Sequence, residues 1–380
     1  MGKKVYLDNA ATTPIDPEVI QAMTEVMQSE FGNPSSTHFF GRSAKGKLEQ
    51  SRRTIAGLIN AQPGEIIFTS GGTEADNMAL ISSVKDLGVK RIITSGIEHH
   101  AVLHTIQACA DADGIQIKLV KINEKGFIDL NHLQTLLEQS ESQTLVSLMH
   151  ANNEIGNLLP LKETADLCKK HNALFHTDTV QTMGHYPFDM GQLKIDFLTC
   201  GAHKLHGPKG VGFLFKRKNL NINPLTHGGS QEAGKRAGTE NLYGIVGMAK
   251  ALEIAYEQLD HHTAQIQNLK AYMIEELQKN FPDVQFNGGS AEHNRSLYTI
   301  LNAQLPRTTK SEMLLFHLDI MGIATSGGSA CSSGSNTGSH VLNALPLGES
   351  RPNIRFSFSK YNSHDDIDYT IQCLKKLYKQ

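Results

Sequence analysis

The sequence predicts an α/β fold with a largely parallel β-sheet and a smaller α/β unit at its C-terminal end. Between residues 66 and 215, short apolar runs typical of buried strands alternate mostly with stretches of helical patterning. This alternation is typical of strand–helix–strand units, in which the strands lie parallel. The seven strand-like runs are residues 66–69, 91–95, 116–121, 144–150, 173–177, 195–200 and 211–215. Since ligands of such sheets bind beyond the carboxyl ends of the strands, functional side chains are expected just after these runs.

The C-terminal third has a different pattern. A helix-rich segment runs from residue 241 to about residue 280 and is long enough to link two domains. Strand–helix alternation then resumes at residues 296–303, 310–321, 353–358 and 363–379. We therefore predict a large domain at residues 14–258 and a small domain formed by residues 1–13 and 259–380.

The composition is that of an ordinary globular protein and excludes several classes. A formal net charge of −2 without a dense basic stripe argues against direct binding of nucleic acid. No apolar run reaches membrane-spanning length, and the N-terminus lacks the apolar core of a signal peptide, so no membrane contact is expected. Five scattered cysteines without a CxxC spacing favour reduced thiols and a cytoplasmic protein. The 18 histidines show no metal-ligand spacing, so no metal is expected.

Lys204 has the most unusual setting of any charged residue. It lies in a Gly/Pro-rich turn, residues 199–210, between two apolar strand-like runs. A lysine at a strand end in a poorly solvated cleft has a lowered pKa and can form a Schiff base. Taken alone, a solvated loop lysine is the commoner interpretation.

A glycine turn follows the first strand-like run. Gly71 and Gly72 allow backbone N–H groups to face an anion, and Thr73 is expected to cap the next helix with Asp76 closing a capping box. The turn has neither the GxGxxG pattern nor the Gly-Lys-Ser/Thr of a P-loop, which weakens a nucleotide-binding hypothesis. A simple well-capped helix is the alternative.

Further polar side chains follow the other strand-like runs. Asp178 comes directly after a buried run, where a carboxylate is costly unless it meets a cation, such as a protonated pyridine nitrogen. The alternative is an Asp that caps the next helix. Asn153 offers an amide, and His99 offers a neutral imidazole that can stack on a flat ring. Arg355 has the fork geometry that suits a carboxylate, with an interdomain salt bridge as the alternative. The glycine-rich loop 227–241 is longer than a structural connection requires.

Seven motifs together resemble the pyridoxal-phosphate enzymes of aminotransferase class V, most closely the cysteine desulfurases. They occur in the family's order at residues 6–13, 31–36, 68–74, 149–156, 203–210, 236–239 and 328–331. The resemblance extends from residue 6 to about residue 370. It implies the fold type I of pyridoxal-phosphate-dependent transferases, with a mainly parallel seven-stranded sheet in the large domain. It also implies conversion of L-cysteine to L-alanine, with transfer of sulfur to an enzyme cysteine as a persulfide.

The resemblance assigns roles residue by residue. Lys204 would bind the cofactor aldehyde, Asp178 its ring nitrogen and His99 its ring face. The full set of residues implied for pyridoxal 5′-phosphate is Gly72, Thr73, His99, Asn153, Asp178, Gln181, His203, Lys204 and Thr239. Lys204, Cys331 and His99 would be the catalytic residues. The family usually has serine two residues before the histidine that corresponds to His203, where this chain has Gly201.

The resemblance also implies the substrate contacts and partners. Arg355, with Asn33 and Asn153, would bind the substrate carboxylate, and Cys331 would accept the sulfur. Cys331 lies within a stretch of mostly Ser and Gly at about residues 326–339, which suits a thiol that must reach two places. Thr239 would reach the phosphate of the neighbouring subunit in a homodimer with shared active sites. A sulfur-acceptor protein, either an iron–sulfur scaffold or a tRNA-thiolation enzyme, would take the persulfide sulfur.

Other functions remain open from the sequence. Within the family, selenocysteine lyase and another class V aminotransferase activity, including a kynureninase-like one, are the alternatives. Outside it stand an inactive dimeric scaffold and a His-rich metal hydrolase. A yellow purified protein would separate the cofactor enzyme from both.

Overall fold

A seven-stranded sheet lies at the centre of the larger part of the protein, with the strand order β2-β8-β7-β6-β5-β3-β4. The computed structural model describes residues 3–139, 142–308, 313–327, 338–347 and 351–378. The strands of this sheet are β2 (Ile66–Thr69), β3 (Arg91–Thr94), β4 (Gln116–Leu119), β5 (Thr144–Ser147), β6 (Leu174–Asp178), β7 (Phe197–Gly201) and β8 (Gly212–Lys216). Only β8 runs antiparallel to its neighbours β2 and β7. Each of the seven predicted runs overlaps one of these strands, although β6, β7 and β8 end one residue later than predicted. The prediction of a mainly parallel sheet is confirmed.

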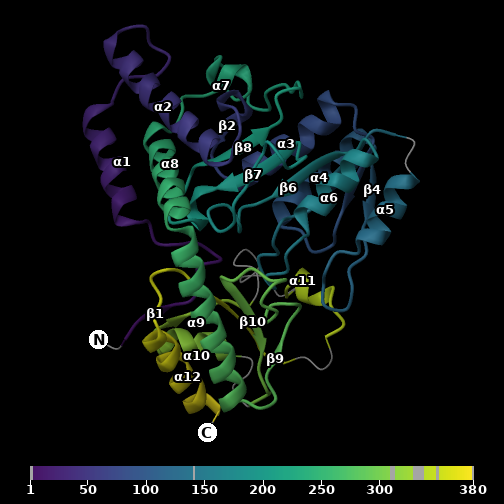
Figure 1. Cartoon of the computed structure of the whole chain (residues 1–380), viewed down its shortest axis with the longest axis vertical. Helices are drawn as coiled ribbons and strands as arrows, with labels where there is room; N and C mark the ends of the chain where they lie inside the picture. Colours follow the sequence, from purple (N-terminus) through teal and green to yellow (C-terminus); the bar gives the residue numbers. More distant parts are fainter. Residues whose placement is uncertain (1–2, 140–141, 309–312, 328–337, 348–350, 379–380) are drawn as a thin grey trace.

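Helices cover both faces of the sheet and make a three-layer arrangement (Figure 1). These elements are α1 (Pro17–Ser29), α2 (Phe39–Leu58), η1 (Pro63–Glu65), α3 (Gly72–Asp86), α4 (His100–Asp113), α5 (Leu130–Glu138), α6 (Leu161–Lys170), η2 (Ala202–Lys204), α7 (Gln231–Gly234) and α8 (Leu242–Glu257). Apolar side chains of α3 and α4 pack on one face, and those of α2, α5, α6 and α8 pack on the other. Apart from the edge strand β4, the strands are buried on both faces, because both faces are covered.

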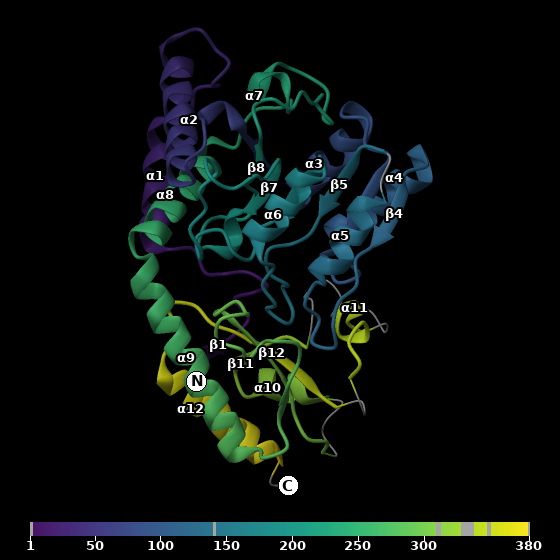
Figure 2. The same cartoon turned by 45° about the vertical axis from the view of Figure 1, so that its right-hand side comes forward.

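The C-terminal part forms a separate unit below the large sheet and its helices (Figures 1 and 2). Its elements are α9 (Leu259–Asn280), β9 (Gln285–Phe286), β10 (Ile300–Gln304), α10 (Leu314–Ile320), β11 (Ile323–Ala324), α11 (His340–Asn343), β12 (Asn353–Ser357) and α12 (His364–Tyr378). Strands β12, β10 and β9 form an antiparallel sheet, and apolar residues of α9, α10 and α12 pack in the same core.

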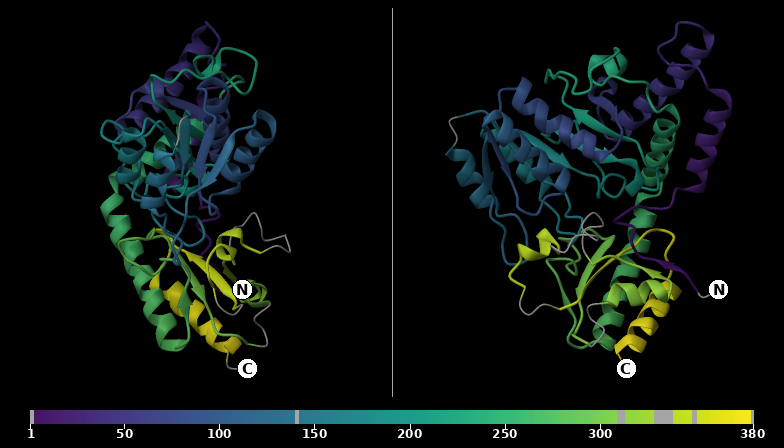
Figure 3. Two further views of the ribbon diagram at one scale, coloured as in Figure 1. Left: turned by 90° about the vertical axis from the view of Figure 1, so that its right-hand side faces the viewer. Right: turned by 180° about the vertical axis from the view of Figure 1, so that it is seen from behind.

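The N-terminus returns to this C-terminal part. Strand β1 (Val5–Tyr6) pairs in parallel with β11, and the Ser357 N–H donates to the Leu7 carbonyl at 2.8 Å. Both ends of the chain therefore lie in the lower part of the molecule (Figure 3). These contacts support the boundaries 14–258 and 1–13 with 259–380, which stay a prediction. In the described ranges, no helix is both long and apolar enough to cross a bilayer.

The expected capping box at Thr73 is wrong. Helix α3 begins at Gly72 with Gly71 as its N-cap, and no side chain caps it. Gly71 has φ 155° and ψ −177°, a conformation reserved almost entirely for glycine, so the helix begins two residues earlier than expected. Thr73 is consequently already inside the first helical turn, and the Glu74 carboxylate accepts the Ser70 N–H at 2.6 Å.

Candidate active site

A cavity of about 220 Å³ opens at the carboxyl ends of the strands. Nine residues predicted for the site line it: Gly72, Thr73, His99, Asn153, Asp178, Gln181, His203, Lys204 and Arg355. They follow β2, β3, β5, β6 and β7 or belong to β12, so residues far apart in sequence meet at one edge of the sheet. The other lining residues, which the sequence did not assign to the site, are Ala10, Ala11, Asp76, Met149 and Val180.

Lys204 lies in the η2 turn directly after β7. Its amine donates hydrogen bonds to the backbone carbonyls of Ala10 and Ala11, the latter at 2.7 Å. His203 is held beside it, with Nδ1 3.2 Å from the Thr12 hydroxyl. The N-terminal segment thus closes one side of the cavity and orients the amine. Only the resemblance of residues 6–13 to a family motif signalled that this segment belongs to the site.

Asp178 ends β6 and is 7% exposed. Its Oδ1 accepts the Val180 N–H at 2.8 Å. Burial, followed by the charge of Asp76, raises the pKa of Asp178 to about 7. A buried carboxylate with so little compensation favours a cationic partner, because the ion pair restores the charged form.

Asp76 is a second buried acid in the cavity that sequence reasoning did not assign to the site. It is 1% exposed, and its Oδ1 has no hydrogen-bond partner among the described residues. Nε2 of His176 lies 3.4 Å from this oxygen, but burial lowers the pKa of His176 to about 4, so its ring is neutral at neutral pH. Burial raises the pKa of Asp76 to about 7. Its position inside α3 gives no sequence signal, because only the fold directs this carboxyl toward the cavity.

The glycine turn before α3 is shaped for an anion. A Cβ at Gly72 would lie 2.6 Å from Cγ2 of Val180, so this position is closed to larger residues unless Val180 moves. The first N–H groups of a helix have no intrahelical acceptor and carry the positive end of its dipole. The backbone of Gly72 and Thr73 therefore offers a phosphate site at the wall of the cavity.

His99 is held in one orientation at the start of α4. Its Nδ1 accepts the Ala101 N–H at 3.1 Å, which places the proton of the neutral ring on Nε2. Burial, followed by the charge of Lys204, lowers the pKa of His99 to about 4. The ring is accordingly neutral at neutral pH, as stacking on an electron-poor ring requires.

We expect the ring resonances of His99 to titrate with a midpoint near pH 4, well below the usual value of about 6.5. Proton-detected NMR of the apoprotein with and without a His99→Gln substitution, which identifies the signal, measures this midpoint. A midpoint near that usual value would mean that the ring is solvated and free to protonate.

Arg355 lies on β12 and is 1% exposed. Its guanidinium donates to the Asn153 carbonyl at 2.9 Å and to Oδ1 of Asp8 at 2.8 Å, while its Nε has no partner among the described residues. Arg355 therefore forms a salt bridge with Asp8, but both residues belong to the predicted small domain, so this is not the interdomain salt bridge considered as the alternative. Because Arg355 also lines the cavity, it can serve a ligand carboxylate and Asp8 together.

Two predicted residues that the structure describes, Asn33 and Thr239, do not line this cavity. Asn33 is exposed between α1 and α2, where its Oδ1 accepts the Ser35 N–H at 2.9 Å. Thr239 is exposed between α7 and α8. Cys331 lies outside the described residues. Their assigned roles stay predictions.

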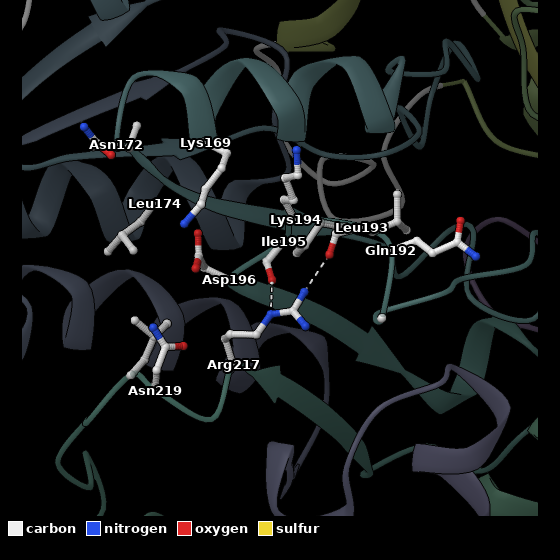
Figure 4. Close-up of a pocket in the computed structure, with 13 residues that line it drawn as sticks. Lys169, Asn172, Leu174, Gln192, Leu193, Lys194, Ile195, Asp196, Arg217 and Asn219 are labelled. Atoms are coloured by element: carbon white, nitrogen blue, oxygen red, sulfur yellow. Dashed lines mark hydrogen bonds between the residues drawn. The ribbon is translucent and has the colours of Figure 1, made fainter.

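A second cavity, of about 450 Å³, lies at the opposite edge of the sheet, near the starts of β6 and β7 (Figure 4). Arg217 lines this cavity, and its guanidinium donates to the carbonyls of Ile195, Met190 and Leu193. Lys194 pairs with Asp166 at 2.7 Å. These cations hold the loops before the strands, so this cavity has a structural explanation.

Fold and cavity together define an α/β enzyme of the aminotransferase type, with a lysine, a buried carboxylate and an anion-binding turn at one sheet edge. The Aminotransferase class-V profile matches residues 5–370, and the chain belongs to this family. Cysteine desulfurase IscS of Dictyoglomus turgidum is 43% identical over 99% of this chain and 95% of its own length.

Solved structures agree. A structure titled NifS-like protein matches with a TM-score of 0.90 and 34% identity, over 99% of this chain and all of the other. A structure titled SspA in complex with cysteine matches with a TM-score of 0.80 and 31% identity, over 95% of this chain and all of the other.

Proposed function

We propose that this protein is a pyridoxal-phosphate-dependent cysteine desulfurase that converts L-cysteine to L-alanine and transfers the sulfur to Cys331 as a persulfide. The observation that carries the proposal is the meeting of Lys204, Asp178 and the Gly72–Thr73 turn in one cavity, beside the guanidinium of Arg355. This chain is similar over nearly its full length to proteins named cysteine desulfurase, which favours this reaction over the others of the family.

The residues of the cavity fit the cofactor group by group. The Lys204 amine suits its aldehyde, and the buried Asp178 carboxylate suits its protonated ring nitrogen. The N-terminus of α3 suits its phosphate. The neutral imidazole of His99 suits the ring face, and Gln181 and Asn153 offer amides to the ring oxygen. When bound, the cofactor withdraws electrons from the substrate Cα.

Lys204 is placed to move the protons. Its amine lies in the cavity against the carbonyls of Ala10 and Ala11, which accept its hydrogens and orient it. Once substrate displaces it, the amine takes the Cα proton and later returns a proton to carbon. Asp178 would keep the ring nitrogen protonated, and buried Asp76, which lines the same cavity, contributes to the raised pKa of Asp178.

Cys331 completes the sulfur transfer. Its thiolate sulfur bonds to the substrate sulfur as the substrate carbon–sulfur bond breaks. The carbon keeps the electron pair and takes a proton, which gives alanine, while the enzyme keeps both sulfur atoms as a persulfide. Neither an oxidant nor a reductant is required.

Arg355 holds the substrate carboxylate in this proposal. Arg355→Lys retains a positive charge but loses the fork, so KM for cysteine is expected to rise by the equivalent of about 1–3 kcal/mol. The cofactor content should stay unchanged, and absorbance together with steady-state kinetics measures both. Since Asp8 also binds Arg355, Asp8→Asn is the matched control for the salt bridge alone. An unaltered KM would leave Arg355 with the salt bridge as its only role.

The active unit is a homodimer in which Thr239 of one chain reaches the phosphate site of the other. L-cysteine is the substrate, and an iron–sulfur scaffold or a tRNA-thiolation enzyme in the cytoplasm takes the sulfur. The exposed position of Thr239, outside the cavity of its own chain, supports the shared site.

Product analysis without a keto acid tests the reaction. The reconstituted protein should release alanine from L-cysteine with no keto acid present, because no amino group is transferred. An aminotransferase would need a keto acid and would form a keto acid from cysteine. Dependence of cysteine consumption on an added keto acid would overturn the proposal.

A further inference from the structure

The loop that carries Thr239, residues 227–241, has a bent backbone at its root, and we refer to this loop as the arm. The short segment α7 within it is not a regular helix, because Glu232 and Ala233 have φ values of 48° and 53°. Gly234 follows with φ 75°. Left-handed conformations are unfavourable for residues with a Cβ, so two in succession need an outside force to hold them.

A buried ion pair supplies that force. Both terminal nitrogens of the Arg52 guanidinium, on α2, donate to the Glu232 carboxylate at 2.7 Å. The Arg52 and Glu232 side chains are 9% and 1% exposed. The pair also forms hydrogen bonds with backbone groups of the edge strand β2. Arg52 donates to the Ile66 carbonyl at 2.8 Å, and Glu232 accepts the Phe68 N–H at 2.9 Å. Arg52 further stacks over the Phe68 ring at 4.5 Å.

Apolar packing alone does not hold the root of the arm in place. A cavity of about 540 Å³ borders Arg52, Glu232 and Ala233. The root of the arm therefore has open space on one side and depends on polar contacts for its shape. Further along, Arg236 binds Glu74 at 2.9 Å, and the Gly238 N–H donates to Gln231 at 3.1 Å, which continues the ordered path to Thr239.

We infer that the Arg52–Glu232 pair is a positioning device that holds the arm in the bent form needed to present Thr239 to the active site of a second copy of this chain. The inference rests on the proposed function, because it assumes that Thr239 acts across the dimer. Cofactor binding in one subunit then depends on a buried ion pair in the other. The pair itself touches neither cofactor nor substrate.

The test uses two substitutions that keep the size of the pair. Glu232→Gln retains an acceptor for the Phe68 N–H but loses the two-oxygen contact, and Arg52→Lys retains the charge but loses the fork. Each homodimer should bind pyridoxal phosphate about tenfold more weakly, the loss expected for one hydrogen bond to a charged group. Absorbance titration of the apoprotein measures this affinity without reference to activity.

Mixed dimers separate an action across subunits from an action within one chain. A Glu232→Gln chain, which retains Lys204, is paired with a Lys204→Ala chain, which contributes an intact arm. The cofactor trapped by borohydride on Lys204 of the Glu232→Gln chain should return to the wild-type level in the mixed dimer. If the pair acted only through β2 of its own chain, the mixed dimer would bind as weakly as the Glu232→Gln homodimer, and the inference would be wrong.

Two controls make either failure readable. When Thr239→Ala replaces Glu232→Gln, its homodimer must bind the cofactor as weakly, and its mixed dimer must recover the same affinity. If it does not, the hypothesis of an active site shared between subunits is wrong. Leu277→Ala, on the buried side of α9, lowers stability without touching the arm and should leave cofactor affinity unchanged. If Thr239→Ala behaves as expected and the pair variants bind normally, the inference alone falls.

The backbone offers a rescue. Ala233→Gly removes the Cβ that opposes φ 53°. Added to Glu232→Gln, it should recover several-fold of the lost affinity in the homodimer. No recovery would show that the bent conformation is not what the pair maintains.

Discussion

Substitution of Lys204 by alanine is expected to stop the conversion of cysteine to alanine, with kcat lower by roughly 10³-fold or more. The amine is the proton carrier of the cavity and the group that fits the cofactor aldehyde, and no other lysine lines the cavity among the described residues. Its described hydrogen bonds go to the backbone carbonyls of Ala10 and Ala11 in the same cavity, so folding should survive the substitution.

Borohydride reduction followed by peptide mapping measures the attachment directly. Wild-type protein should carry the label on Lys204, and Lys204→Ala should carry none. Thermal unfolding of the same samples controls for loss of structure. A label on another lysine, or turnover within a factor of about ten of wild type, would remove Lys204 from the mechanism.

Substitution of Cys331 by serine is expected to abolish sulfur release while cysteine still binds. A serine hydroxyl has a much higher pKa and forms no persulfide, whereas the reactions at Lys204 do not use Cys331. The variant should therefore show a spectral change when cysteine is added, yet release neither alanine nor sulfide. Selenocysteine is expected to be affected less, because selenium leaves carbon with less help from a thiolate.

The other cysteines provide the matched control. Cys109, Cys168, Cys200 and Cys373 are all buried, and none of them lines the cavity. Burial raises the pKa of the Cys109, Cys168 and Cys200 thiols, which disfavours the reactive thiolate. Cys109→Ser should therefore keep full desulfurase activity. Wild-type turnover by Cys331→Ser would instead contradict the desulfurase assignment.

Much of the fold could be predicted because its signals are local. Each strand of the large sheet is a short apolar run between polar segments, and burial on both faces produces that run directly. Ligands bind beyond the carboxyl ends of parallel strands, and this rule predicts from the sequence alone that Asp178, Asn153 and His99 lie near Lys204.

The remaining features depend on contacts between distant segments. Asp76 lies inside α3, and only its packing against His176 and the cavity gives it a role. The capping prediction failed because Gly71 adopts a conformation that composition alone does not indicate. The partner of Arg355 is Asp8, which is 347 residues away in sequence. Asn33 and Thr239 lie outside the cavity of their own chain, where a single sequence gives no geometry.

A single-turnover experiment with L-cysteine tests the central claim most directly. Enzyme in excess over cysteine is quenched, alanine is quantified, and the sulfur-bearing peptide is identified by mass spectrometry. The proposal predicts one alanine for each persulfide, with the persulfide on Cys331. Alanine formed without any enzyme-bound sulfur, or sulfur bound to a different cysteine, would contradict it.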